Sequence, residues 1–171
     1  MRDSDALENN PHVSRSALEA IHSQVYGWAL SRCDFDHATA EDLMQQAYVE
    51  LLSGSARFDN KSTLKTFLFS VVQNLARSRF RRISSRLRLV KQYQQESVTD
   101  AIEPGVDDAV WRAVRALPAR QRDIIELVFC RELTIEQAAS VMGVSTGTGR
   151  VHYDRAKKAL RSRLQDWAEE E

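Results

Sequence analysis

The chain has 171 residues, of which 43% are hydrophobic, and its 24 basic side chains balance 24 acidic ones. This length accommodates one ordinary domain or two small ones, and the apolar share is typical of a globular protein. No run approaches the roughly 18 apolar residues that cross a bilayer, and residues 1–10 contain no apolar signal segment. Cys33 and Cys130 form no pair motif, so we expect a cytoplasmic protein without membrane insertion and without a disulfide.

The zero net charge conceals an uneven distribution along the chain. Acidic residues dominate 1–50, basic residues dominate 51–95, and every charge in 96–108 is acidic. Blocks of opposite sign indicate separate surfaces for separate partners, although each block alone is equally compatible with a solvated helix face. Aromatic residues beside the basic block favour nucleic acid as its partner.

Apolar residues recur at helical spacing from residue 16 onward, which predicts an all-α fold. The first predicted helix spans 16–31, and 34–38 is predicted to be a loop. Thr39 is a candidate cap for a second helix, with Asp42 in its first turn. The apolar stripe of the second helix consists of Leu43, Ala47, Tyr48, Leu51 and Leu52.

A polar loop over 53–62 precedes a third helix, which we predict to run from about Thr63 to Arg82. Phe80 lies near its basic end, and Phe67 is expected in the core rather than as a stacking surface. The apolar face consists of Leu64, Phe67, Leu68, Val71, Val72 and Leu75. After residue 83 the pattern fades into Ser, Gln and acidic residues, which is typical of a linker, with a short helix near 87–93 as an alternative.

A second helical module begins at about Ala109. Its first helix has the apolar stripe Val110, Trp111, Val114 and Leu117, and Pro118 marks a break before another helix over 120–130. We therefore predict two small helical domains joined by a flexible linker. The predicted divisions are a tail (1–15), a first domain (16–83), the linker (84–109) and a second domain (110–167).

The segment from Leu133 to Leu164 predicts a helix-turn-helix. Thr134 and Gln137 form a capping box for a helix over 135–142, and Gly143 ends that helix. Ser145 and Thr146 offer a cap for a second, basic helix. The apolar stripe of this second helix consists of Tyr153, Ala156, Leu160 and Leu164. In such a motif the second helix enters the major groove of DNA.

Two sets of motifs, in order and at matching spacing, resemble the bacterial sigma-70 family in its two-domain extracytoplasmic-function (ECF) group. Region 2 of that family is matched by Glu41 to Tyr48 and by Phe58 to Leu68, followed by Asn74. Region 4 is matched by Leu117-Pro118, by 133–142, and by Gly147-Thr148 leading to Arg155-Ala156. Each motif alone is weakly specific, but together they cover nearly the whole chain.

The resemblance implies a sigma factor that binds core RNA polymerase, through its β′ coiled coil and β flap, and directs promoter recognition and transcription initiation. The residues implied for polymerase contact are Glu41, Asp42 and Gln45. Those implied for the −10 element, read as a single strand by cationic and aromatic groups, are Lys61, Ser62, Thr63, Lys65, Asn74, Arg77 and Arg81. Those implied for the −35 element, in and just after the helix-turn-helix 134–155, are Thr148, Arg150, Val151, Asp154, Arg155 and Lys158. Among them Arg150 and Arg155 match positions that approach bases, whereas Thr148 and Lys158 suit contacts with the DNA backbone.

Several residues depart from the family pattern. Gln46 stands where Glu is common, Phe67 where Trp is usual and Ser78 where Asp often occurs. Gly149 replaces a small apolar residue, usually Val, and should weaken its helix by about 1 kcal/mol, with Tyr153 filling the space that it leaves. Asp154 should repel phosphate unless it accepts a hydrogen bond from a cytosine N4.

The main alternative function is a stand-alone helix-turn-helix regulator whose N-terminal half senses a signal or dimerises. An enzyme is disfavoured, because the four histidines are scattered and no glycine-rich phosphate loop or metal-ligand cluster occurs, so we expect no cofactor and no metal. The resemblance also implies a restraining anti-sigma factor as a partner. A Ser/Thr kinase is a further candidate partner, since phosphorylation would add negative charge beside the polymerase-docking helix. The candidate hydroxyls are Ser53, Ser55, Ser62 and Thr63.

Overall fold

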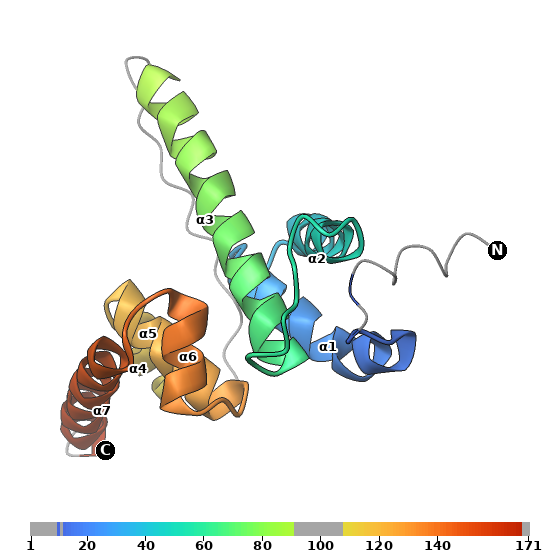
Figure 1. The fold of residues 1–171 in the computed structure, drawn as a ribbon. Coiled ribbons are helices and arrows are strands. Elements are labelled where there is room, and N and C mark those ends of the chain that lie inside the picture. Colours follow the sequence, from blue (N-terminus) through green and yellow to red (C-terminus); the bar gives the residue numbers. More distant parts are fainter. Residues whose placement is uncertain (1–9, 11, 91–107, 169–171) are drawn as a thin grey trace. The chain divides into compact units, whose positions relative to one another are not determined.

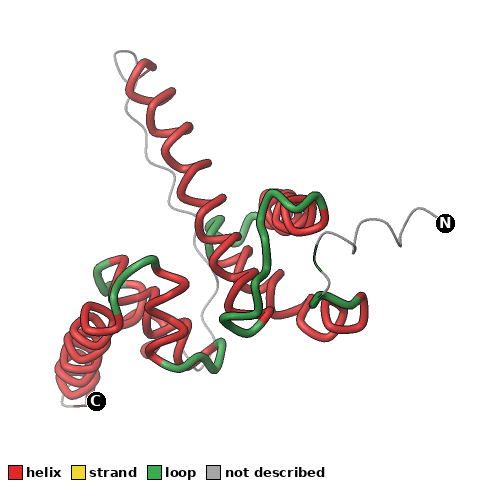
Figure 2. The backbone as a smooth tube through the Cα atoms, viewed as in Figure 1, coloured by secondary structure: helices red, strands yellow, loops and turns green. Residues whose placement is uncertain are grey.

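The computed structural model describes residue 10, residues 12–90 and residues 108–168, and within these ranges it contains helices and loops but no strand (Figures 1 and 2). The predicted all-α fold is thus confirmed. The chain divides into two compact units, unit 1 (Met1–Leu87) and unit 2 (Arg88–Glu171). Unit 1 contains α1 (Arg15–Ser31), α2 (His37–Leu52) and most of α3 (Leu64–Val90). Unit 2 contains α4 (Asp108–Arg115), α5 (Ala119–Ile125), the π-helix η2 (Glu126–Cys130), α6 (Ile135–Met142) and α7 (Thr146–Ala168).

The core of unit 1 is organised around Trp28 of α1. Its side chain is fully buried and stacks on the buried Phe69 of α3, with 5.7 Å between ring centroids. The indole N–H donates a hydrogen bond to the Phe69 carbonyl at 3.1 Å, so the polar atom of this buried ring is satisfied. Asn10 and Val13, assigned by the sequence to a tail, are buried in the same unit, and Asn10 Oδ1 accepts from Phe58 N at 2.9 Å.

The start of α2 differs from the prediction. Asp36, not Thr39, is the N-cap: its carboxylate accepts from Ala38 N at 3.2 Å and from the Thr39 hydroxyl at 2.7 Å. The cap lies closer to α1 than predicted, because Asp34 and Phe35 adopt left-handed backbone angles. These angles separate α1 from α2 by a tight turn. Consequently Asp42 lies beyond the first turn of α2, contrary to the prediction.

Helix α3 begins as predicted, since Thr63 Oγ1 accepts from Thr66 N at 3.1 Å. It does not end at Arg82, however, but continues to Val90, because 83–90 contains neither Gly nor Pro to stop it. Figure 1 shows its C-terminal half extending beyond α1 and α2. Residues 91–107 of the predicted linker lie outside the described residues, and its last two positions, 108 and 109, begin α4.

In unit 2 the predicted apolar stripe of α4 is only half correct. Val114 and Leu117 are buried, whereas Val110 and Trp111 are 48% and 42% exposed. The short helix α4 contacts α5 and α7, and among its residues with described burial, 110–115, only Ala113 and Val114 are buried. After Pro118, the predicted helix over 120–130 is present, but its last turn widens into the π-helix η2.

Candidate functional site

The candidate polymerase-binding residues lie together on the exposed face of α2. Glu41, Asp42 and Gln45 are all exposed, and their spacing places them on neighbouring turns of one face. Gln46 and the 56% exposed Val49 extend that face toward the end of the helix. The opposite face packs into unit 1 through Ala40, Leu43, Met44, Ala47 and Leu51. The face is therefore available to a partner, and its only large apolar group is Val49.

In the loop before α3, Lys61 forms a local ion pair with Asp59. Lys61 Nζ lies 2.6 Å from Asp59 Oδ2, and Asp59 Oδ1 also accepts from Lys61 N at 3.3 Å. Asn60 between them has a left-handed φ of 59°, as expected in so tight a turn. The hydrogen bond from Lys61 lowers the pKa of the Asp59 carboxyl, and the same bond raises the pKa of Lys61.

Of the remaining candidates for the −10 element, Ser62 and Thr63 lie in the loop before α3, and the other four are spread along α3. Lys65 and Arg77 are half-buried, while Asn74 and Arg81 are exposed. Lys65 and Arg81 are separated by about 24 Å of helix at 1.5 Å per residue, which makes the set a strip. Arg81 also lines an open groove on the exposed half of α3. The other residues of that groove, none of them a sequence-based candidate, are Ser78, Arg82, Ser85 and Arg86.

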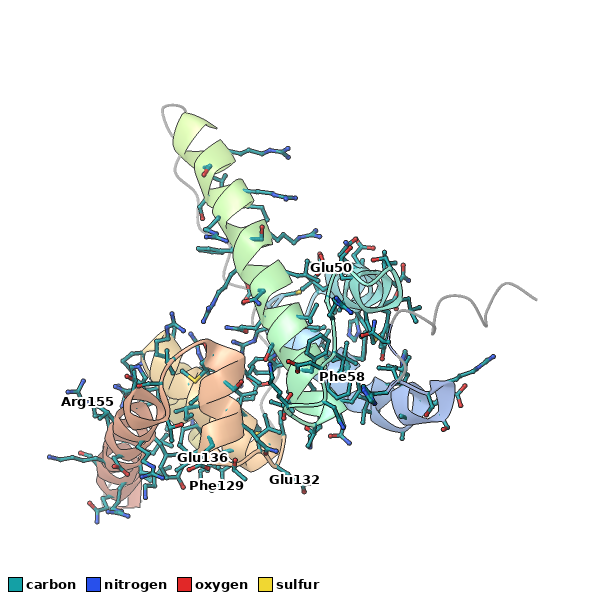
Figure 3. All side chains as sticks on the ribbon, viewed as in Figure 1. Glu50, Phe58, Phe129, Glu132, Glu136 and Arg155 are labelled. Carbon is teal, nitrogen blue, oxygen red and sulfur yellow. The ribbon has the colours of Figure 1, made fainter. Side chains whose placement is uncertain are left out.

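Phe67 is half-buried and packs against Phe58, with 5.3 Å between ring centroids. Phe58, labelled in Figure 3, is itself buried. The expectation that Phe67 belongs to the core is consistent with this contact.

The helix-turn-helix forms as predicted. Thr134 Oγ1 accepts from Gln137 N at 3.2 Å, and Gln137 Oε1 accepts from Thr134 N at 2.9 Å, which completes the capping box. Gly143 ends α6 with a left-handed φ of 67°, and Ser145 Oγ accepts from Thr148 N to cap α7. These contacts are local in sequence, which is why their residues were identifiable in advance.

Gly149 lies where α7 packs closely against α6. A Cβ at this position would stand 2.8 Å from Ala139 Cβ and 3.7 Å from Ile135 Cγ2. The space beside Gly149 is therefore occupied by α6, and the expectation that Tyr153 fills it is wrong. Tyr153 instead stacks on Phe129 of η2, with Lys157 Nζ 4.6 Å from its ring centroid. A glycine is needed here because only hydrogen fits between the helices.

All six sequence-based candidates for the −35 element are exposed on α7. At 100° per residue they fall within about 160° of the helix circumference, opposite the buried Gly149 and Ala156. The exposed set consists of Thr148, Arg150, Val151, Asp154, Arg155 and Lys158. Asp154 lies 3.9 Å from Lys157 Nζ, so the carboxylate has a cation beside it.

One residue on this surface was missed by the sequence. Glu136, in the first turn of α6, accepts from Arg150 Nη2 at 3.1 Å. The two residues are fourteen positions apart, so no local pattern signals their contact. The start of α6 lowers the pKa of the Glu136 carboxyl through its own backbone N–H, and Arg150 lowers it further.

Within the described residues, no group of three or more His, Cys, Asp and Glu side chains is arranged to hold a metal ion. No helix in the same part of the chain is both long and apolar enough to cross a bilayer.

Two family profiles match the chain, one in each unit. The profile described as Sigma-70 region 2 matches residues 17–86, and the one described as Sigma-70, region 4 matches residues 107–160.

Several curated proteins are similar over most of the chain. The ECF RNA polymerase sigma factor EcfG of Rhodopseudomonas palustris is 30% identical over 131 residues, which is 73% of this chain and 71% of that protein. The ECF RNA polymerase sigma factor SigF of Caulobacter vibrioides is 24% identical over 159 residues, 92% of this chain and 89% of the relative. SigC of Mycobacterium tuberculosis, named likewise, is 25% identical over 159 residues, covering 91% and 85%.

Two solved structures are similar to this chain over most of its length. The sigma factor RpoE of Bartonella quintana, in complex with the anti-sigma factor NepR, superposes with a TM-score of 0.70 at 26% identity, covering 88% of this chain and 96% of that one. CnrH, in complex with the cytosolic domain of CnrY, superposes with a TM-score of 0.61 at 20% identity, covering 95% and 96%, which supports the fold alone.

Proposed function

The chain belongs to the ECF group of the sigma-70 family, the RNA polymerase sigma factors that direct promoter recognition and transcription initiation, and we propose how its two units share that work. Unit 1 binds core polymerase and the −10 element, and unit 2 binds the −35 element. The observation that carries this division is that α2 and α7 each present their candidate residues on an exposed face opposite the core of their own unit. As transcription initiation in bacteria takes place in the cytoplasm, we assign the protein to that compartment.

The exposed face of α2 is the proposed polymerase contact. Glu41 and Asp42 supply negative charge, and Gln45 supplies an amide on the next turn. A docking face with two carboxylates suits a cationic partner surface, such as the β′ coiled coil. Gln46 leaves this face less acidic than the family pattern, so Asp42 and Glu41 carry most of its charge.

The loop 59–63 and the α3 strip are the proposed −10 contact. Single-stranded DNA is held by cations along its backbone, and a strip of about 24 Å matches an extended strand better than a closed pocket. The half-buried Lys65 and Arg77 begin this strip, and the exposed Arg81 continues it along α3.

The exposed face of α7 is the proposed −35 contact. The guanidinium groups of Arg150 and Arg155 suit guanine O6 and N7, and Lys158 suits a phosphate. Thr148 is held at the start of the helix, since its N–H donates to Ser145 Oγ and its hydroxyl lies 2.9 Å from the same oxygen. A backbone phosphate contact fits that position at a helix N-terminus.

We further propose regulation by an anti-sigma factor, because the similar RpoE structure is a complex with one. Among the hydroxyls proposed for a Ser/Thr kinase, Ser53, Ser55 and Thr63 are exposed and Ser62 is half-buried. A phosphoryl group there would add about 1.5–2 negative charges close to the α2 face.

A binding experiment with core polymerase tests the proposal. We expect the full chain to retain core polymerase on a resin, and Asp42→Arg to weaken this at least about tenfold, because like charges across an interface cost several kcal/mol. Glu19→Arg is the matched control, since it reverses an exposed carboxylate on α1 instead of α2. A chain that fails to bind core polymerase but binds duplex DNA with full affinity contradicts the proposal and favours a stand-alone regulator.

A further inference from the structure

The contact between Glu136 and Arg150 joins the two helices of the helix-turn-helix at the proposed DNA surface. Glu136 Oε1 lies 3.1 Å from Arg150 Nη2, and the side chains are 56% and 63% exposed. Arg150 belongs to the exposed face of α7, whereas Glu136 belongs to α6, which anchors unit 2 through Ala138, Ala139, Val141 and Met142. The carboxylate thus stands on a supporting helix and reaches a side chain of the reading helix.

The position of this carboxylate relative to Arg150 is set by rigid elements. The capping box fixes the first turn of α6, in which Glu136 lies. The close approach of Gly149 to Ala139 fixes how near α7 can come to α6, and Arg150 directly follows Gly149. The carboxyl pKa is lowered, so Glu136 is negatively charged at neutral pH.

We propose that Glu136 is a positioning residue that directs Arg150 toward a base edge and away from the DNA backbone. This inference rests on the proposed function, in which Arg150 contacts the −35 element. A guanidinium has five N–H donors, so one can be given to Glu136 while others remain for guanine O6 and N7. A carboxylate beside that guanidinium repels phosphate oxygens, which disfavours a backbone contact that carries no sequence information. Glu136 therefore lowers the overall affinity for DNA and increases the discrimination between base pairs.

Among the residues that the structure describes, no other carboxylate pairs with Arg150 in this way. Asp154, one turn further along α7, lies beside Lys157. Glu132, in the loop before α6, is exposed and labelled with Glu136 in Figure 3. Glu132→Gln removes the same charge as Glu136→Gln from the same unit, and it serves as a matched control.

The test measures promoter binding by the full chain with core polymerase. Affinities are compared for a −35 element and its single-base variants at several salt concentrations. With Glu136→Gln we expect tighter binding to mismatched elements and about two- to fivefold less discrimination at one base pair, the range that an exposed ion pair supplies. We also expect the slope of log affinity against log salt to steepen by about 0.9, the value of one added phosphate contact.

The controls separate positioning from a general effect on folding. Glu132→Gln should change neither the discrimination among −35 variants nor the base pair at which it occurs. Glu136→Asp should preserve part of the discrimination, because it keeps the charge. In an Arg150→Ala background, Glu136→Gln should have no further effect on specificity. Equal weakening on every sequence with an unchanged salt slope, or a lower melting temperature that accounts for the loss, overturns the inference.

The failure of the inference and the failure of the proposed function give different results. If Arg150→Ala leaves the base preference unchanged, Arg150 does not read a base, and both the proposed role of Arg150 and the inference fall. If Arg150→Ala removes the preference at one base pair and Glu136→Gln does not reduce it, only the inference is overturned.

Discussion

The two proposed DNA surfaces each hold a cation beside a carboxylate, but they do so in different ways. In unit 1, Lys61 and Asp59 belong to one turn, and the same carboxylate also accepts from the backbone of Lys61. In unit 2, Arg150 and Glu136 belong to different helices whose spacing is set by Gly149. The first pair orders its own loop, whereas the second links the packing of two helices to the side chain that we propose to contact DNA.

The two pairs therefore differ in whether they can fix the orientation of a cationic side chain. A local pair moves with its loop, so it can follow a flexible single strand without imposing an orientation on it. An interhelical pair is held by buried residues on both sides, so it can aim a guanidinium at one base edge.

The largest effect is expected from Gly149→Val. Its Cβ would stand 2.8 Å from Ala139 Cβ, a methyl group bonded directly to the α6 backbone, so the helices must separate. We expect unit 2 to lose about 1–3 kcal/mol of stability, and the Arg150–Glu136 contact to be lost. Hydrogen exchange of amides in α6 and α7 measures the first effect, and discrimination among −35 variants measures the second.

Gly147 provides the matched control for that substitution. Only Ser145 Oγ, at 3.9 Å, lies near a Cβ built at Gly147. Gly147→Ala should therefore stabilise unit 2 by up to about 1 kcal/mol through helix propensity. Equal destabilisation by both substitutions would show that the close contact with Ala139 is not the cause.

A smaller effect is expected from Thr134→Ala. The substitution removes the side-chain acceptor of the capping box, which fixes the turn that carries Glu136. We expect the stability of unit 2 to fall by about 1 kcal/mol and that of unit 1 to stay unchanged. Hydrogen exchange of amides in α6 and α1 measures the two stabilities. An equal loss of protection in α1 would contradict the independence of the two units.

The shifted pKa values in the two ion pairs predict how the contribution of each pair to stability depends on pH. The pKa of Asp59 lies below its usual 3.8 and that of Glu136 below its usual 4.5, so each pair stabilises the fold above those values and is lost as the pH falls through the lowered pKa. The pKa of Lys61 lies above 10.5, so the unit 1 pair is also lost as the pH rises through that raised value. The difference in unfolding midpoint between wild type and either Asp59→Asn or Glu136→Gln should be constant from about pH 6 to about pH 8 and should vanish in strong acid. A difference that grows in acid contradicts the assigned charge states.

The smallest effect is expected from Asp59→Asn on sequence preference. Because its pair with Lys61 is local and exposed, we expect discrimination among −10 variants to change less than about twofold. Filter binding of −10 single strands by the full chain with core polymerase measures this. A larger change than that caused by Glu136→Gln at the −35 element would reverse the comparison between the two units.

Features that depend on neighbouring residues were predictable from the sequence. The capping box of Thr134 and Gln137, the stop at Gly143 and the cap at Ser145 are each closed by residues at most four positions apart. The exposed faces of α2 and α7 followed from helical spacing alone, although Leu164, predicted in the apolar stripe of α7, is 36% exposed.

Features that depend on tertiary contacts were not predictable. The cap of α2 was assigned to Thr39 instead of Asp36, since two adjacent polar residues compete and the path of the chain after α1 decides between them. The sequence alone predicts that Gly149 weakens its helix, because the residue that requires a glycine there, Ala139, lies on another helix. The amphipathic spacing predicts Trp111 in the apolar stripe of its helix, although its side chain is 42% exposed and the burial of the stripe begins further along α4 at Val114.

Run-off transcription with core polymerase on genomic fragments tests the central claim most directly. The account predicts transcripts that appear only when the chain is added, with start points downstream of paired −35 and −10 elements. It also predicts that Arg150→Ala changes the −35 preference and Arg81→Ala weakens −10 use. Fragments that bind the chain alone but yield no transcript above core polymerase would contradict the account.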